Sequence, residues 1–124
     1  MAGIKRVEDL VAWQRAISLT KAVYTASSRF PEAERFGLQS QIRRASVSVP
    51  SNIAEGFGRE TTSDLVRFLR MARGSLFEIR TQFVIAVDLA YLSQSDVPSE
   101  LVDETDRVLQ ALIRSLEARR EPAN

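Results

Sequence analysis

The stretch that decides the fold is LVRFLRMARGSLFEIRTQFVIAVDLA, from Leu65 to Ala90. Apolar side chains recur in it at alternating intervals of four and three residues, the period of a helix face buried against other helices. The positions on this face are Leu65, Leu69, Ala72, Leu76, Ile79, Phe83, Ala86 and Ala90. A pattern sustained over this length predicts one long core helix, and we expect its large apolar side chains to be buried.

Three further segments show the same period, and together they predict helices over residues 9–29, 31–56, 63–91 and 98–120. The connections between these segments are short, so neighbouring helices should run antiparallel. The sequence therefore predicts an all-α protein, a single domain over residues 1–124 that folds as an antiparallel up-down-up-down four-helix bundle. Three helices around a swapped fourth are the alternative arrangement.

The second segment carries a proline and polar side chains that a plain core helix does not need. Pro50 removes a backbone donor and crowds the carbonyl of Ser46, so we expect this helix to be kinked near Pro50. Helical spacing also places a line of polar side chains along or beside the core face of this helix. The members of this polar line are Gln41, Arg44, Ser48, Asn52 and Glu55.

Two interpretations of the polar line are open. In one, the polar line borders a groove that binds a ligand. In the other, which we favour, its role is structural: Asn52 is buried and bonds the backbone near Pro50 or a side chain of an adjacent helix. Arg44 and Glu55 then pair with neighbouring helices or subunits, first of all with charged side chains of the next helix. The candidate partners there are Arg73, Arg80 and Glu78.

The long third helix has more apolar surface than one core face needs. Val66, Phe77 and Val84 form a second stripe about 100° from the first by the helix period. One bundle buries one broad face of each helix, so this stripe indicates a contact between subunits. A wide buried face within one subunit is the alternative. The candidate interface residues are Val66, Arg73, Phe77, Glu78, Arg80 and Val84.

The composition excludes several classes of function. The chain has no cysteine and no histidine, which removes disulfides, thiolate metal sites and the commonest general base. Its carboxylates show no metal-site spacing, and it has no glycine-rich phosphate loop. We therefore expect a protein that is not an enzyme and takes no cofactor or metal. We also expect it to be cytoplasmic and to have no membrane partner, because the sequence shows neither a signal peptide nor a membrane-spanning run.

The formal net charge is +1, but the charges are distributed unevenly. Residues 1–60 carry nine Lys or Arg against six Asp or Glu, whereas residues 61–124 carry eight against ten. Arginine outnumbers lysine fifteen to two. This bias favours bidentate pairing with carboxylates or phosphates. High-GC codon usage combined with surface ion pairs explains the bias equally well.

Five stretches match one known family in order and at its spacing. They are Asp9–Gln14, Phe30–Leu38, Gln41–Ala45, Val49–Gly56 and Ala72–Glu78. The chain thus resembles the four-helix-bundle family of proteins encoded in intervening sequences of bacterial 23S ribosomal RNA genes. That family also includes the accessory variability determinant of diversity-generating retroelements. The resemblance implies a homopentamer with a central pore and, for the retroelement members, a nucleic-acid-binding surface and a reverse transcriptase partner.

Two hypotheses for function follow. The first is a nucleic-acid-binding accessory module for RNA or DNA, in which several copies strengthen a weak basic patch by avidity. The second is a protein–protein interaction scaffold without nucleic-acid binding, whose arginines pair with carboxylates between subunits. A contiguous basic face and a salt-dependent affinity for nucleic acid distinguish the first hypothesis. Its candidate contacts are Lys5, Arg6, Arg15, Lys21, Arg43, Arg59, Arg67 and Arg70.

Overall fold

The computed structural model describes residues 3–120, and these residues form helices, turns and loops but no strand. The α-helices of this part are α1 (Val11–Ser27), α2 (Leu38–Phe57), α3 (Thr62–Asp88) and α4 (Ser99–Arg120). Short 3-10 helices precede α1 and lie within two of the connections: η1 (Val7–Asp9), η2 (Glu32–Glu34) and η3 (Gln94–Asp96). The expected all-α class with four helices is confirmed.

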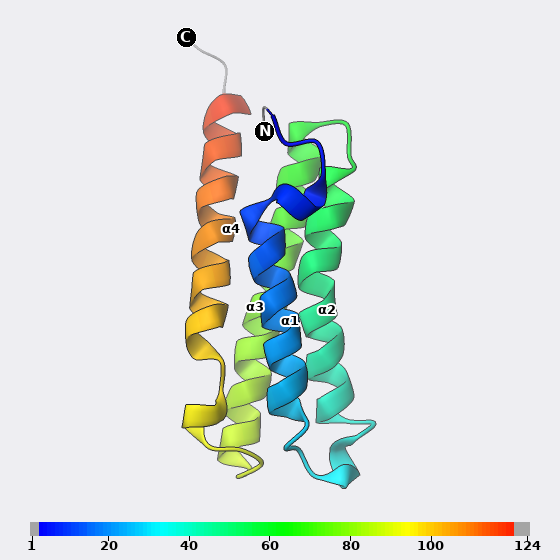
Figure 1. Ribbon diagram of the computed structural model, residues 1–124, viewed down its shortest axis with the longest axis vertical. Helices are drawn as coiled ribbons and strands as arrows, with labels where there is room; N and C mark the ends of the chain where they lie inside the picture. The colour runs from blue at the N-terminus through cyan, green and yellow to red at the C-terminus, as the bar shows by residue number, and fades with distance from the viewer. Residues whose placement is uncertain (1–2, 121–124) are drawn as a thin grey trace.

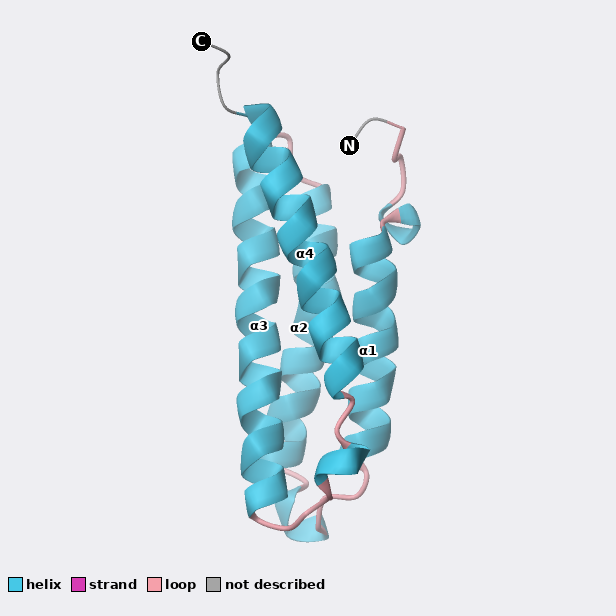
Figure 2. Ribbon diagram, turned by 90° about the vertical axis from the view of Figure 1, so that its left-hand side faces the viewer, coloured by secondary structure: helices cyan, strands magenta, loops and turns pink. Residues whose placement is uncertain are grey.

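The four helices lie side by side along the long axis of the molecule (Figures 1 and 2). Figure 1 shows successive helices running in opposite directions, so that the start of α1 and the end of α4 lie at the same end. The helix α2 packs against α1 and α3, and α4 packs against the same two helices. None of the helices in residues 3–120 is long and apolar enough to cross a membrane.

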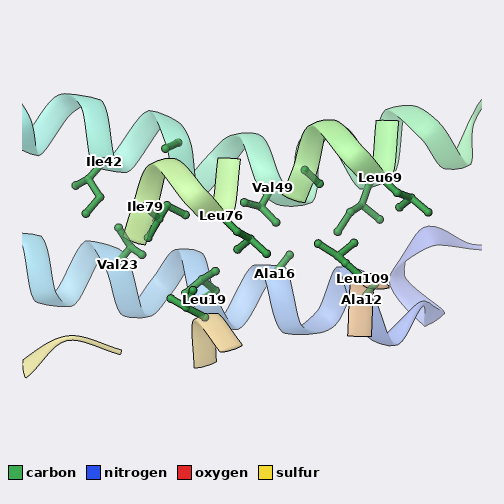
Figure 3. Close-up of a cluster of buried hydrophobic side chains, with 14 of the residues drawn as sticks. Ala12, Ala16, Leu19, Val23, Ile42, Val49, Leu69, Leu76, Ile79 and Leu109 are labelled. Atoms are coloured by element: carbon green, nitrogen blue, oxygen red, sulfur yellow. The ribbon is translucent and has the colours of Figure 1, made fainter. Parts of the chain in front are cut away.

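The core lies along the axis between the helices, and α3 supplies much of it. Figure 3 shows side chains of all four helices pointing into one apolar cluster. The large side chains of the α3 seam are at most 7% exposed, as its period predicts. These side chains are Leu65, Leu69, Leu76, Ile79 and Phe83.

The start of α2 differs from the sequence-based boundary. The helix begins at Leu38 rather than at Pro31, because Pro31 has an extended backbone with ψ of 153°. The Glu34 carboxylate accepts the Leu38 N–H at 2.9 Å and the Tyr91 hydroxyl at 2.7 Å. These two hydrogen bonds hold the pKa of Glu34 below its ordinary value and join the α1–α2 and α3–α4 connections.

The end of α3 also differs from the prediction, because the helix stops at Asp88 and Ala90 leaves the core face. Ala90 has a φ of 62°, a left-handed conformation in which glycine is strongly preferred. The Tyr91 N–H donates to the Ala86 carbonyl and the Ala90 N–H to the Val87 carbonyl, each at 2.9 Å. This is the hydrogen-bond pattern of a Schellman motif.

We expect Ala90→Gly to raise the free energy of unfolding by about 1 kcal/mol, because glycine adopts a left-handed backbone without the Cβ clash. Urea unfolding followed by circular dichroism measures the change. Ala111→Gly, at an exposed position inside α4, is the matched control and should lower stability by about 1 kcal/mol. Equal losses in both variants would contradict the Schellman interpretation.

Candidate nucleic-acid interface

The proline of α2 is accommodated by a side chain from another helix. The helix continues through Pro50, so the Ser46 carbonyl lacks its usual partner one turn later. The Thr20 hydroxyl of α1 donates to this Ser46 carbonyl at 2.9 Å and shares its proton with the Ala16 carbonyl of α1, also at 2.9 Å. Ser46 is fully buried. A hydroxyl of α1 therefore satisfies the backbone acceptor that Pro50 frees. The kink itself stays a prediction.

We expect Thr20→Val to lower the free energy of unfolding by about 1–2 kcal/mol, because the buried Ser46 carbonyl loses its donor. Thr25→Val is the matched control on the same helix, since its hydroxyl bonds only a carbonyl of α1 itself and is exposed. In a Pro50→Ala background the restored N–H can serve Ser46, so the cost of Thr20→Val should shrink there. Equal costs in both backgrounds would contradict this account.

The polar line of α2 divides into two groups. Asn52 is half-buried, and its amide nitrogen donates to the Ser48 carbonyl at 2.9 Å. The Ser48 hydroxyl donates to the Ser75 hydroxyl of α3 at 2.6 Å. Gln41, Arg44 and Glu55 are exposed instead.

The structure does not show the expected pairing of Arg44 and Glu55 with charged side chains of α3. Glu55 lies 3.8 Å from Arg59, one turn along the chain. Arg44 forms no ion pair with any of residues 3–120. Arg73 and Arg80 point to carboxylates of α4, which leaves α2 without them. Arg44 therefore remains free to meet a ligand.

A groove of about 700 Å³ runs along the outward face of α2, beside the end of α1 and the α1–α2 connection. Its charged lining consists of Arg35, Arg43 and Arg44, and no acidic residue of the described chain lines it. Two aromatic side chains, Tyr24 and Phe36, border the same groove. The other lining residues are Gln39, Ser40, Val47, Ser48 and Ser51.

Arg43 holds a fixed position in this groove. Its guanidinium donates to the Ser27 hydroxyl at 2.8 Å and to the Tyr24 carbonyl at 3.1 Å. The same guanidinium lies 4.6 Å from the centroid of the Tyr24 ring, a cation–π contact. Arg43 thus links α2 to the end of α1 and places a positive charge against an aromatic surface.

The groove lies in the most basic part of the helical framework. Together α1 and α2 carry four basic side chains, Arg15, Lys21, Arg43 and Arg44, and a single acidic one, Glu55. An excess of positive charge attracts polyanions, and arginine binds phosphate by bidentate hydrogen bonds.

The eight basic residues that the sequence marks as nucleic-acid contacts are not gathered in this groove. Only Arg43 lines it, while Lys5 and Lys21 are exposed elsewhere without an ion pair to residues 3–120. The other five are paired with carboxylates: Arg6 with Glu8, Arg15 with Glu104, Arg59 with Glu55, Arg67 with Asp64 and Arg70 with Glu117. These pairs reduce the charge that the five arginines can offer to a phosphate.

The second apolar stripe of α3 is partly inside the subunit. Val66 is only 3% exposed and belongs to the subunit's own core. The prediction that it lies on an outer stripe is therefore wrong. Phe77 and Val84 are 51% and 59% exposed. Near its start, α3 therefore buries a wider face than the helix period indicates, whereas the rest of the stripe is exposed.

Arg73 and Arg80 connect this exposed face to α4. Arg73 donates to the Asp106 carboxylate at 2.6 Å, and Arg80 donates to Asp103 at 2.6 Å. Both guanidiniums lie over the Phe77 ring, 5.4 and 5.8 Å from its centroid. Glu78, the remaining interface candidate, is exposed. Both arginines therefore contact the exposed Phe77 ring while they bind carboxylates of α4.

Asp106 gives this cluster a dependence on pH. Burial alone raises the pKa of its carboxyl, but hydrogen bonds from Arg73 and Gln110 outweigh burial and hold the pKa below the ordinary value. The stabilisation is therefore complete above the unfolded pKa and is lost as the pH falls through the folded pKa. We expect the stability difference between wild type and Asp106→Asn to shrink as the pH falls below about 4 in urea titrations. A difference that is constant from neutral to acid pH would contradict this.

The sequence reasoning missed Arg35, Phe36 and Tyr24 as groove residues. Arg35 and Phe36 lie in the α1–α2 connection, where no helical period marks an outward face. The sequence places both in the predicted helix over residues 31–56, so the one available signal is an aromatic residue next to an arginine.

The fold and these surfaces define an all-α protein of four helices with an arginine-lined groove on α2 and an exposed apolar face on α3. A model of the family described as 23S rRNA-intervening sequence protein matches residues 8–114. The chain belongs to this family, and the resemblance inferred from the five sequence stretches is confirmed.

The chain is also similar to the crystal structure of a protein with unknown function from the S23 ribosomal protein family of Bacteroides thetaiotaomicron. The TM-score is 0.75, with 83% of this chain and 98% of that chain covered at 18% sequence identity. This likeness shows the shared fold. No curated protein matches the chain.

Proposed function

We propose that this protein is a non-enzymatic, homo-oligomeric nucleic-acid-binding protein, with the groove on α2 as its binding surface. The observation that carries the proposal is the lining of the groove, three arginines with no acidic residue among them. Phosphate contacts supply most of the affinity of sequence-independent nucleic-acid binding. Repetition of the groove in an oligomer multiplies a weak contact by avidity, which compensates for a net charge of only +1.

The proposal of an oligomer is supported by the exposed apolar side chains of α3, above all Phe77 and Val84. Large apolar groups at the surface of a small domain favour contact with another protein surface. The pentamer is the number that the family resemblance implies. Light scattering is expected to report a mass several times that of the 13.9 kDa chain, and Phe77→Glu is expected to lower it. A 13.9 kDa particle for the wild type would contradict the oligomer.

Nucleic-acid binding is tested by fluorescence anisotropy with labelled RNA and DNA between about 50 and 200 mM salt. The affinity should fall with salt, and Arg35→Gln with Arg44→Gln should weaken it and lower the salt slope by about 1–2. The matched control is Arg107→Gln with Arg114→Gln on α4, which removes the same charge from exposed positions outside the groove. Equal weakening by both pairs, or no salt-dependent binding, would contradict the proposal.

A protein–protein interaction scaffold is the second candidate function. It is favoured by the exposed apolar side chains of α3 and by the pairing of five of the eight candidate phosphate contacts with carboxylates of the same chain, which makes these five less suited to bind phosphates. A wild-type protein that assembles through α3 but binds neither RNA nor DNA at low salt would support the scaffold.

A further inference from the structure

We propose that the groove on α2 takes single-stranded nucleic acid in preference to a duplex, with a base stacked on Phe36 and phosphates beside Arg35 and Arg44. This inference rests on the proposed function and adds the form of the ligand. Its basis is the combination of aromatic rings and arginines on one surface that no acidic residue lines.

Phe36 is the first observation. It is 88% exposed, more than any other large apolar side chain described, so the fold gains almost nothing from burying it. The Arg35 guanidinium lies 5.3 Å from the centroid of its ring, which leaves most of the ring uncovered. An aromatic ring that the core does not use, at the edge of a basic groove, is suited to receive another flat ring.

Charge is the second observation. Arg44 is exposed and forms no ion pair with residues 3–120, so its whole charge is available to a phosphate. Arg35 has only an exposed carboxylate, that of Glu32 at 3.6 Å, and surface pairs of this kind are weak. Both arginines line the same groove as Phe36, which brings phosphate-binding groups and a stacking surface together.

The third observation is a second aromatic surface. Tyr24 borders the groove and is 42% exposed, and Arg43 is fixed against it by two hydrogen bonds. The pair offers a rigid, partly aromatic wall on the α1 side of the groove. Two aromatic contacts along one basic groove resemble the way in which single-strand-binding surfaces alternate base stacking with backbone contacts.

A duplex does not use these features. Its bases stack on one another and present only their edges in the grooves, so a surface aromatic ring finds no base face to contact. A single strand exposes base faces, and stacking on an aromatic side chain then adds affinity without regard to sequence. Arginines alone suffice for a duplex backbone, whereas Phe36 adds affinity only for unpaired bases.

The test compares labelled oligothymidylate of about 16 nucleotides, the upper end of single-strand site sizes, with a DNA duplex of equal length. We expect Phe36→Ala to weaken single-strand binding about 5- to 150-fold, the value of one lost base stack, and to leave duplex binding unchanged. Phe36→Trp should retain single-strand binding. Phe36→Leu keeps an apolar side chain without a ring, so it should behave like the alanine variant.

The outcomes separate this inference from the proposed function. If wild type binds both ligands equally and Phe36→Ala changes neither affinity, single-strand preference is overturned and nucleic-acid binding stands. If neither ligand binds at low salt, the proposed function fails and the inference fails with it. If Phe36→Ala or Phe36→Leu changes the mass in light scattering but not the affinity, Phe36 is a contact between copies and the inference is overturned.

Discussion

Replacing Leu76 with alanine is expected to lower the free energy of unfolding by about 2–5 kcal/mol, the usual cost of removing a buried leucine side chain. Leu76 is fully buried near the middle of α3. Figure 3 shows it in the same cluster as Leu19 of α1 and Val49 of α2. The lost side chain therefore leaves a cavity where three helices meet, and rigid helices cannot collapse to fill it.

Urea unfolding followed by circular dichroism at one protein concentration measures this cost. Met71→Ala is the control on the same helix, since Met71 is 47% exposed and should contribute less than about 0.5 kcal/mol. Comparable losses in the two variants would show that the α3 seam does not form the core of the bundle.

The second large effect is expected at Gly56, where α2 and α3 approach closely. A Cβ atom there would lie 2.7 Å from the Phe68 Cβ and 3.3 Å from the Leu65 carbonyl oxygen. We expect Gly56→Val to lower the free energy of unfolding by about 3 kcal/mol, because its added carbons push the two helices apart. The sequence predicts a helix that ends at residue 56, and the structure places Gly56 in the last turn of α2, where it is a packing residue.

Gly74→Val is the matched control for this prediction. Gly74 lies inside α3, and a Cβ there would meet nothing within 4 Å. The change should alter stability by less than about 1 kcal/mol, because valine is a somewhat better helix former than glycine. A similar loss in both glycine variants would mean that the approach of α2 to α3 does not limit the side chain at residue 56.

The interior of the helices was predictable because burial imposes a period on the sequence. The α3 seam shows this, since Leu69, Leu76 and Ile79 follow the helix period and are fully buried. The ends of the helices were less predictable, because local rules compete there. Pro31 suits the first turn of a helix, yet its backbone is extended and the Glu34 carboxylate instead caps Leu38 after an irregular segment.

The candidate site was predictable only in part. Helical spacing placed Arg44 and Ser48 on one line of α2, and both line the groove. Phe36 and Tyr24 were not predicted, because both fall within predicted helices, where an aromatic residue usually belongs to the core. Nothing in the sequence shows that Thr20 of α1 bonds the carbonyl freed by Pro50.

The sequence by itself determined the helical class, the core face of α3 and the family, because these depend on periods and motifs within short stretches. Only the tertiary structure decided which arginines pair with a carboxylate of a distant helix. Arg15 pairs with Glu104 and Arg70 with Glu117, across 89 and 47 residues, whereas Arg44 has no such partner. Such pairs depend on how each helix is rotated against its neighbours, which the packing of all four core faces decides together.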